Sequence, residues 1–502
     1  MIFEMKKTLS ISKLLFLLLF LNACGDSFLD RPPLGSLTEG SFPQTAAEAV
    51  SATNGIYNTL RVWQFNTGGF PLLDIMSDDA RKGSNPGDAS QLLMFDEFSY
   101  TPSNEHIENW YRTLYLGIRR SHLVLEKVPD IDMDETLKNR LLGEARFLRG
   151  YFYSILARAF GDVPLVLSSQ VTSGVTVSSS EQIYQDVVFP DLLFALDNLP
   201  EQSEYEEADI GRASKGAARG LLSRLYLFRK DFISAEKYAM EIINSQQYDL
   251  EETFFLAFGP SGQFGVESVF EIGALPEASM ELGGNQFGNT QGVRGTPNYG
   301  WGFNRPAHEW MLFIGADDPR LDASVIFPGE VLDGVLIVGD LSSPDTLYTD
   351  NTKTEILEIE AYNQKVYAPG EEVIAQWGHN RKIIRYADVL LMAAEALNEN
   401  NKMDQALIYL NLVRNRAREG NQTILPDITT IDQNQLREAI FEERRRELFM
   451  EGLRFWDLVR TDKAGAVLGP LGFIEGKHEL FPLPQSEVDI SNGVIVQNPN
   501  WN

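Results

Sequence analysis

The sequence predicts a mainly α-helical fold made of helical hairpins, with an irregular, partly β-structured loop region inserted among them. One observation is the segment 381–417, where apolar residues recur at helical spacing on two faces of a first helix. A second apolar helix starts near Ala406, after a polar break at 398–402. Another observation is the segment 216–245, which has the same plan and places Ala235 where Ala406 stands. A helix that is apolar on two sides must lie between neighbours, so these hairpins are typical of stacked tetratricopeptide-like repeats.

Further helices are predicted in the N-terminal half of the chain. Apolar residues recur at helical spacing over 44–62, 107–128, 136–160 and 182–199. Pro190 lies inside the last of these segments and is expected to kink it. The stretch 63–99 mixes polar and aromatic residues without a period, so we expect it to be irregular.

Glycine density marks the inserted loop region. The 44 residues 259–302 hold 11 glycines, more than a regular helix can accommodate, so we expect a long loop there. Alternating patterns over 331–338 and 356–366 predict short strands. Towards the C-terminus we expect a strongly charged helix over 436–459 and an extended tail over 481–501.

The N-terminus predicts export and lipid attachment. A lysine-containing start precedes the short apolar run Leu14–Leu21, which is too short to span a bilayer and is typical of a signal peptide. The run leads into Leu-Asn-Ala-Cys, which resembles a bacterial lipobox ending at Cys24. We therefore expect a signal peptide at 1–23 and a lipid on Cys24. A tether should follow at 24–40.

The rest of the chain, 41–502, is predicted to form a single domain with a helical N-terminal half (about 41–250) and a loop-rich C-terminal half (about 251–502). The formal charge of −28 argues against a nucleic-acid partner, because phosphates would be repelled. Cys24 is the only cysteine, which excludes an intramolecular disulfide.

Searches for catalytic and metal-binding motifs predict neither an active site nor a metal or cofactor. His308 begins an HExxH-like pattern, but Leu312 stands where the second histidine is needed. Glu443, Glu447 and Glu451 recur at i, i+4 and i+8, and paired carboxylates are what glycosidases use. Arginines 444, 446 and 454 lie one turn away and should keep those carboxylates ionised. We therefore expect a stabilising network, with Arg444 and Arg454 as the partners of the glutamates.

Aromatic residues in the irregular segments are the candidates for ligand binding, because an aromatic face can stack on a sugar ring. Two loops, 63–81 and 285–305, carry most of them, and we expect these loops to form a shallow surface. Trp301 and Tyr299 would stack on sugars, with Trp63 as a third platform. The remaining predicted site residues are Phe65, Asn298, Arg305, Asp78 and Arg81.

Long stretches of the chain, in matching order, resemble the SusD-like (RagB/SusD) family of outer-membrane nutrient-uptake lipoproteins. The stretches are the lipobox with Phe28-Leu29-Asp30 behind it, AEAVSATNGIYNTL, WYRTLYLGI, GEARFLRGYFYSILARAFGDVPLV, the hairpin 216–245, IIRYADVLLMAAEALNE, LVRNRAR, ERRRELFMEGLRFWDLVR, FPLPQSE and QNPNW. The chain departs from the family pattern near Cys24, which only Asp26 follows closely as an acidic residue.

The resemblance implies a SusD-like fold with four tetratricopeptide-like hairpins and ligand-binding loops. It also implies a lipid-anchored protein at the outer-membrane surface that passes oligosaccharides, or in some members peptides, to a SusC-like TonB-dependent transporter. Members of the family are not enzymes and need no cofactor. Two other classes remain open from the residues, namely a secreted glycosidase and a repeat scaffold whose only ligand is another protein.

Overall fold

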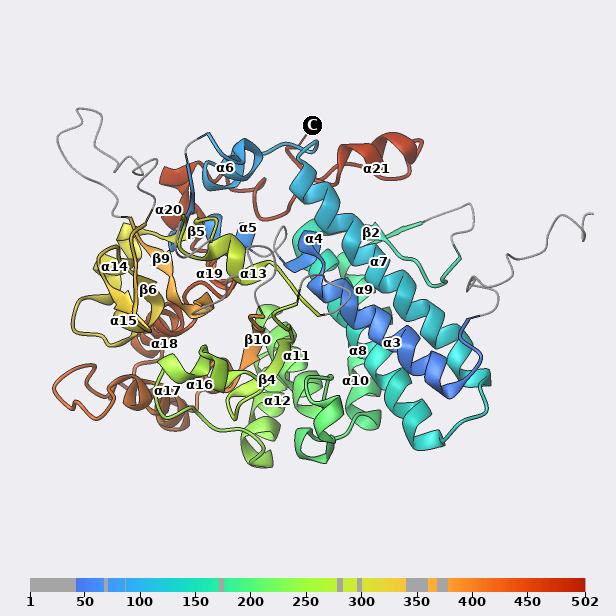
Figure 1. Ribbon diagram of the computed structural model, residues 1–502, viewed down its shortest axis with the longest axis horizontal. Coiled ribbons are helices and arrows are strands. Elements are labelled where there is room, and N and C mark those ends of the chain that lie inside the picture. Colours follow the sequence, from blue (N-terminus) through green and yellow to red (C-terminus); the bar gives the residue numbers. More distant parts are fainter. Residues whose placement is uncertain are drawn as a thin grey trace, which may run out of the picture.

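The computed structural model describes residues 42–66, 71–85, 87–170, 176–277, 283–295, 300–339, 360–367 and 378–501 (Figure 1). Helices dominate these segments, and the strands are short and paired in twos. The predicted fold class, mainly α with an inserted irregular and β-structured region, is therefore confirmed. No helix within the described residues combines the length and the apolar composition that crossing a bilayer requires.

The N-terminal helices follow the predicted periodicity closely. Helix α3 (Ala46–Arg61) packs on α7 (Glu105–Lys127), and α7 packs in turn on α8 (Glu135–Phe160). A single 3₁₀ turn, η1 (Val128–Asp130), lies in the connection between α7 and α8. Six of the longer helices, α3, α7, α8, α11, α12 and α18, begin at a polar side chain that accepts a hydrogen bond from the first turn, which satisfies a backbone N–H that would otherwise be unpaired. These caps are Thr45, Asn104, Asp134, Ser214, Asp231 and Asp432.

The helix predicted over 182–199 is interrupted, as its proline suggested. It consists of α9 (Ser180–Ile183), a π turn (Tyr184–Val188) and α10 (Phe189–Asn198). Pro190 lies in the first turn of α10, where its missing N–H leaves no hydrogen bond unmade. The irregularity therefore lies in the wider turn that precedes the proline.

The two hairpins that define the fold class are present where the sequence placed them. They are α11 (Lys215–Phe228) with α12 (Phe232–Ser245), and α16 (Tyr386–Glu399) with α17 (Met403–Ala417). Helix α12 packs against α16, so the second hairpin stacks on the first. Within the second hairpin, Ala406 of α17 is fully buried, and its small side chain allows α17 to approach α16 closely. Nearly all residues of α16 are buried, in agreement with its two apolar faces.

The loop prediction over 259–302 is incomplete, because the segment contains a strand. Strand β4 (Ser268–Ile272) pairs antiparallel with β10 (Arg381–Arg385), and both are almost entirely buried. A second antiparallel pair joins β1 (Ala80–Gly83) to β5 (Phe303–Pro306). The other strands are β2 (Val163–Pro164) with β3 (Val177–Ser178), β6 (Val325–Ile326) with β9 (Tyr362–Asn363), and β7 (Val331–Leu332) with β8 (Val335–Leu336).

The expected strands over 331–338 are thus confirmed as the β7–β8 hairpin. Only 360–366 of the second expected strand region is described, and it forms β9 and the 3₁₀ turn η7 (Gln364–Val366). The stretch 63–99, expected to be irregular, contains short helices. These and the remaining short helices are α4 (Trp63–Asn66), α5 (Pro71–Ile75), α6 (Ser90–Asp96), α13 (Phe287–Gln291), α14 (His308–Ile314), α15 (Arg320–Ser324), α20 (Ala464–Leu468) and α21 (Gln485–Ile490), together with the 3₁₀ turns η3 (Gln202–Glu204), η4 (Glu207–Asp209), η5 (Phe255–Ala257), η6 (Pro260–Gly262) and η8 (Gly469–Leu471).

Two C-terminal predictions are wrong in detail. The single charged helix expected over 436–459 is two helices, α18 (Gln433–Glu447) and α19 (Arg454–Arg460). Between them Met450 and Gly452 have positive φ values of 56° and 73°, which a continuing helix does not allow. The tail expected to be extended includes α21.

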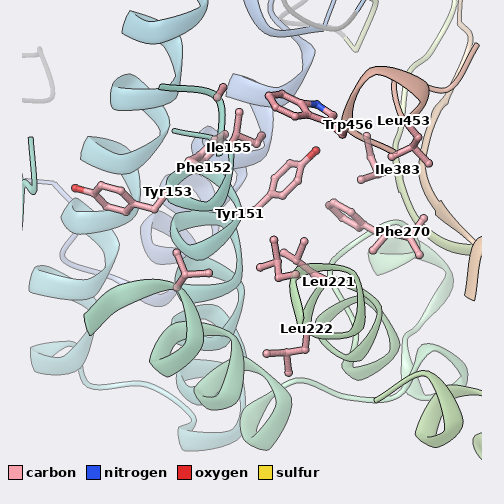
Figure 2. Close-up of a cluster of buried hydrophobic side chains, with 14 of the residues drawn as sticks. Tyr151, Phe152, Tyr153, Ile155, Leu221, Leu222, Phe270, Ile383, Leu453 and Trp456 are labelled. Carbon is pink, nitrogen blue, oxygen red and sulfur yellow. The ribbon is translucent and has the colours of Figure 1, made fainter. Parts of the chain in front are cut away.

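The core joins the two halves of the chain around α8. In Figure 2, Tyr151 of α8 extends towards Trp456 of α19, and Phe270 of β4 and Ile383 of β10 lie beside it. All four are buried and belong to one hydrophobic cluster. The paired strands β4 and β10 thus connect the helical stack to the irregular region that carries the candidate site.

Candidate ligand-binding site

Two loops that the sequence predicts to share a ligand surface do meet, as the antiparallel ribbon β1–β5. Arg81 lies opposite Arg305 in the register, and Gly83 lies opposite Phe303. The pairing continues past the strand ends, because the Ser84 N–H donates to the carbonyl of Gly302 at 2.6 Å. The ribbon therefore fixes residues from 80–84 beside residues from 302–306, although more than 200 positions separate them.

Trp301 stands at the start of this ribbon, between two glycines that the backbone requires. Its N–H donates to the carbonyl of Asn289 at 2.7 Å, and its side chain is partly exposed. A Cβ on Gly300 would lie 2.2 Å from the carbonyl carbon of Gly292, so no other residue fits at 300 without moving the loop. Gly302 has a φ of +72°, which favours glycine. The glycines thus permit the tight backbone on both sides of Trp301, whose side chain is partly exposed.

Charged and polar groups lie at the end of the ribbon that Trp301 precedes. The Arg294 guanidinium donates to Ser84 Oγ at 3.0 Å and pairs with Asp88 at 3.1 Å. Arg294 itself packs against Gly302, which adjoins Trp301. The Lys82 ammonium lies 5.9 Å from the ring centroid of Phe303. An aromatic ring edged by hydrogen-bonding groups is the arrangement that suits a sugar, with one apolar face and a hydroxylated rim.

A network of buried polar side chains connects the ribbon to the neighbouring elements. The Asn304 side-chain amide donates to Gln291 Oε1 at 2.8 Å and to Asp74 Oδ2 at 3.1 Å. Asn363 donates to the same Gln291 oxygen at 3.0 Å, and Gly452 N–H donates to Asp74 Oδ1 at 2.8 Å. The network ties together α5, α13, β5, β9 and the turn after α18. Burial raises the pKa of the Asp74 carboxyl to about 6, although Asn304 and Gly452 stabilise its ionised form.

Three of the predicted site residues are engaged in packing or ion pairs within the protein. Phe65 is fully buried and packs edge-on against Phe152 at 5.9 Å, so its place is in the core. Arg305 is buried under the ribbon, over the ring of Tyr362. Asp78 accepts two hydrogen bonds from Arg454, at 2.8 and 2.9 Å, which serves the packing of α19. Sequence reasoning placed these three wrongly because it could not tell a loop side chain that points inward from one that points outward.

Of the other predicted site residues, the structure describes Arg81, Trp63 and Trp301. Arg81 is mostly buried on the ribbon, with 16% of its side chain exposed, and pairs with the exposed Glu309 at 2.9 Å. Trp63 is partly exposed on α4, with its ring 5.7 Å from the ring of His106 on α7. Asn298 and Tyr299 lie outside the described residues. The ribbon therefore carries Arg81 on β1 opposite Arg305, while Trp301 precedes β5 at its other end, and the Arg294–Asp88 ion pair, which the sequence analysis did not single out, lies at that end beside Ser84.

The glutamates that resembled a catalytic pair belong to a buried ion network. Glu443 accepts from Arg320 at 2.7 Å and from Arg414 at 2.5 Å. Glu447 accepts from Arg320 and Arg385, at 3.1 Å each, and from Arg416. The network confirms that these carboxylates form ion pairs with arginine.

The partners that the sequence analysis assigned to these glutamates are wrong. Arg444 bonds Asp388 and Asp457, each at 2.9 Å, and Arg454 bonds Asp78. Glu451 pairs instead with Lys365 and Arg385, at 2.8 Å each. The break after α18 explains the error, because residues beyond 447 no longer continue the helical face.

The electrostatics of this network do not suit acid catalysis. Burial alone raises the pKa of the Glu447 carboxyl, but Arg416, Arg385 and Arg320 outweigh burial and hold that pKa at about 2. Burial likewise opposes ionisation of Glu451, yet Arg385 and Lys365 lower its pKa. A general acid needs a raised pKa, so neither group fits that role. Within the described residues, no group of three or more His, Cys, Asp or Glu side chains is arranged to hold a metal ion.

Two family models match the chain. Residues 285–501 match the model of the SusD family, and residues 73–227 match a model described as "Starch-binding associating with outer membrane". Among curated relatives, the SusD-like protein P2 of Formosa agariphila is 27% identical over 518 residues, covering 97% of this chain and 99% of the relative. A SusD-like protein of Bacteroides ovatus is 27% identical over 462 residues, covering 87% of this chain and 79% of the relative.

Solved structures agree with these matches. A SusD homologue from Bacteroides thetaiotaomicron superposes with a TM-score of 0.80 at 26% identity, covering 95% of this chain and 100% of that one. A structure named as a laminarin binding SusD-like protein superposes with a TM-score of 0.77 at 26% identity, covering 91% of this chain and 100% of that one. The likeness extends over both the helical stack and the loop-rich half.

Proposed function

The chain belongs to the SusD-like family, and from this premise we propose that it is a glycan-binding lipoprotein of the outer membrane. In this proposal the protein sits at the cell surface, anchored through Cys24, and delivers oligosaccharides to a SusC-like TonB-dependent transporter. The observation that carries the proposal is Trp301, which is partly exposed and stands between two glycines at the end of the β1–β5 ribbon that also holds the Arg294–Asp88 ion pair. The protein binds its ligand without cleaving it.

The ligand surface that we propose consists of Trp301 and its polar neighbours, with Arg81 on the same ribbon. Asn298 and Tyr299 directly precede Trp301 in the chain and stay part of the proposal, as does Trp63 as a further platform. Oligosaccharide is favoured over the alternative ligand class, peptide, because a 26% identical neighbour is named as laminarin binding. A single stack on an aromatic ring contributes about 1 kcal/mol beyond area burial, so such a surface reaches useful affinity only by combining several contacts.

The test is isothermal titration calorimetry of the wild type and of Trp301→Ala against a panel of soluble oligosaccharides that begins with laminarin fragments. Losing one stack of about 1 kcal/mol should weaken binding about fivefold, without abolishing it. Trp63→Ala measures whether the second platform takes part. Circular dichroism confirms that each variant is folded. Wild-type affinity in folded Trp301→Ala would exclude the ribbon from the site.

The same experiment separates the alternatives. Affinity should rise with oligomer length, because a longer glycan reaches more of the weak contacts at once. Short peptides that bind where no glycan does would favour a peptide-binding lid. Release of reducing ends from the same panel would instead indicate a glycosidase. A repeat scaffold would bind the transporter and respond to neither ligand class.

A further inference from the structure

Asn304 of β5 has a fully buried side-chain amide whose hydrogen bonds are incomplete. Its Nδ2 donates twice, to Gln291 Oε1 at 2.8 Å and to Asp74 Oδ2 at 3.1 Å. Its Oδ1 is also buried but accepts no hydrogen bond within the described residues. Buried polar atoms are rarely left unpaired, because the lost hydrogen bonds to water are then not replaced. A second orientation of the amide, with a donor facing Oδ1, would explain the unpaired acceptor.

Asp74 of α5 can supply that donor when its carboxyl is protonated. In the ionised form both oxygens accept, Oδ2 from Asn304 and Oδ1 from the Gly452 N–H at 2.8 Å. Protonation places a hydroxyl hydrogen on the carboxyl, which then donates as well as accepts. When the Asn304 amide turns over, its Oδ1 replaces Nδ2 and accepts from this hydroxyl. Asp74 and Asn304 therefore have one hydrogen-bonded arrangement for each protonation state.

The second arrangement breaks the link between Asn304 and Gln291. After the amide has turned over, Asn304 Oδ1 faces Gln291 Oε1, and neither of these oxygens can donate a hydrogen bond. Gln291 still accepts from Asn363 Nδ2 at 3.0 Å, so α13 stays joined to β9. Protonation of Asp74 thus removes the connection from α13 to β5.

The same two segments hold the backbone of Trp301. Its N–H donates to the carbonyl of Asn289 in α13 at 2.7 Å, and the Gly302 N–H donates to the carbonyl of Gly292 at 3.0 Å. The bond from Asn304 to Gln291 is a side-chain link between these segments. Losing it allows β5 to move away from α13, and the position of Trp301 changes with them.

Charged groups from several elements lie around Asp74. The elements with which α5 packs include α6, α19, β1 and β5. Asp96 of α6 accepts from the Lys82 N–H of β1, and Arg454 of α19 pairs with Asp78. The other charged side chains of these elements are Arg81, Arg305, Asp457 and Arg460. The small cavity that Asp74 borders is also lined by Lys365, His379, Arg381, Lys382 and Glu451.

These surroundings set the pH range in which Asp74 changes its charge. Burial is the main influence and raises the pKa of the carboxyl to about 6, and the charge of Asp79 adds to this rise. The hydrogen bonds from Asn304 and Gly452 and the charge of Arg381 oppose burial without outweighing it. The carboxyl is therefore mostly ionised at pH 7 and mostly protonated at pH 5.

We propose that Asp74 and Asn304 form a pH-sensitive switch beside the proposed glycan surface, in which protonation of Asp74 turns the Asn304 amide over and releases β5 from α13. The inference rests on the proposed function, because it names a regulation of the site that Trp301 carries. Mildly acidic conditions weaken glycan binding, and neutral conditions restore it.

The first experiment is isothermal titration calorimetry at pH 7 and pH 5, with laminarin oligosaccharides as the probe. About one carboxyl in eleven stays ionised at pH 5, and only this form holds Trp301 in place, so the affinity of the wild type should fall by up to about tenfold. Asp74→Asn carries a permanent donor and should bind weakly at both pH values.

Asp96→Asn is the matched control. Burial also raises the pKa of the Asp96 carboxyl to about 6, but this carboxyl accepts from the Lys82 N–H and does not contact Asn304. The variant should therefore keep the pH dependence. A wild-type affinity for the glycan that is equal at pH 5 and pH 7 would overturn the switch and leave the proposed function standing.

The second experiment needs neither a glycan nor a variant. Hydrogen–deuterium exchange of the wild-type protein, corrected for the intrinsic pH dependence of amide exchange, reports on the backbone N–H groups of Trp301 and Gly302. Their protection should fall at least about threefold from pH 7 to pH 5, whereas the protection of α16 should not fall. Protection of Trp301 and Gly302 that is unchanged or higher at pH 5 would overturn the proposal, whether or not any glycan binds.

Discussion

Individual buried charges fix how the loop-rich half attaches to the helical stack. Arg385 at the end of β10 pairs with Glu267, which precedes β4, and with Glu447 and Glu451 at the end of α18 and in the turn after it. Glu447 is fully buried among three arginines. A buried cluster of this kind is stable only when it is complete, because removing one charge leaves its partners uncompensated in a medium of low dielectric constant.

Glu447→Gln should therefore lower the free energy of unfolding by about 3–5 kcal/mol, since it removes the shared acceptor of Arg320, Arg385 and Arg416. Urea unfolding at pH 7 measures this loss. Glu442→Gln on the same helix is the matched control, because Glu442 is exposed and forms only an i, i+4 pair with Arg446. The control should change stability by less than about 1 kcal/mol. Loss of glycan binding with unchanged stability in Glu447→Gln would show that the cluster belongs to the ligand site instead.

The buried carboxyl of Asp74 predicts that the stability of the folded protein depends on pH. Burial raises the pKa of its carboxyl from 3.8 to about 6, so between these values the folded protein holds a proton that the unfolded chain has lost. Stability should then fall as pH rises from 4 to 6, by up to about 3 kcal/mol from this group. Urea unfolding across that range should show a smaller fall in Asp74→Asn. Asp96, whose pKa burial also raises to about 6, should contribute a second fall of the same sign. An identical slope in Asp74→Asn and the wild type would contradict this account.

At the level of elements, the β1–β5 ribbon determines where Trp301 stands. The ribbon joins two segments of the chain, and the loop before β5 returns so closely on itself that Gly300 N–H donates to Val293 O at 2.8 Å. Asn304, in the left-handed region with a φ of 52°, anchors β5 to the buried network beneath it. The aromatic platform is therefore held by backbone geometry and by hydrogen bonds to neighbouring elements.

Gly300→Ala should weaken glycan binding while leaving the fold largely intact. Its new Cβ would overlap the backbone of Gly292 at 2.2–2.3 Å, and backbone cannot move aside as a flexible side chain can, so Trp301 must shift. Calorimetry with the glycan that the wild type binds measures the effect, and the melting curve reports the fold. Gly55→Ala is the control, because it lies in α3 with no atom near its Cβ and should keep both properties. Wild-type affinity in Gly300→Ala would show that the platform tolerates this shift.

Helices were predictable from the sequence, and strand pairing was not. The periodicity of α3, α7, α8 and the two hairpins is a local signal that burial of one or two faces leaves in the sequence. Strand β4 is five residues long and pairs with β10 more than 100 positions later, so nothing local marks it. The same limit applies to the site. Trp301 and its glycines were visible as a pattern, but the pairing of Arg294 with Asp88 exists only in the folded chain.

At the scale of the whole molecule, two family models match separate halves, 73–227 and 285–501, and the structure shows how these halves become one body. The strand pair β4–β10 and the core around Tyr151 connect them (Figure 2). The single domain over 41–502 stays a prediction.

At the same scale, the prediction that the protein is attached to the membrane rests on the N-terminal sequence, which lies outside the described residues. Cys24 lies three positions after the apolar run Leu14–Leu21, at the end of a lipobox-like stretch, so we propose that acyl chains on Cys24 form the anchor. Two or more acyl chains exceed what stable anchoring requires. Cys24→Ser should therefore appear in the soluble fraction, or remain as the unprocessed precursor, and should not incorporate labelled palmitate. Ser27→Ala, three residues downstream, is the control and should stay with the outer membrane. Mature Cys24→Ser protein that remains in the membrane at the wild-type level would show that another part of the chain holds it there.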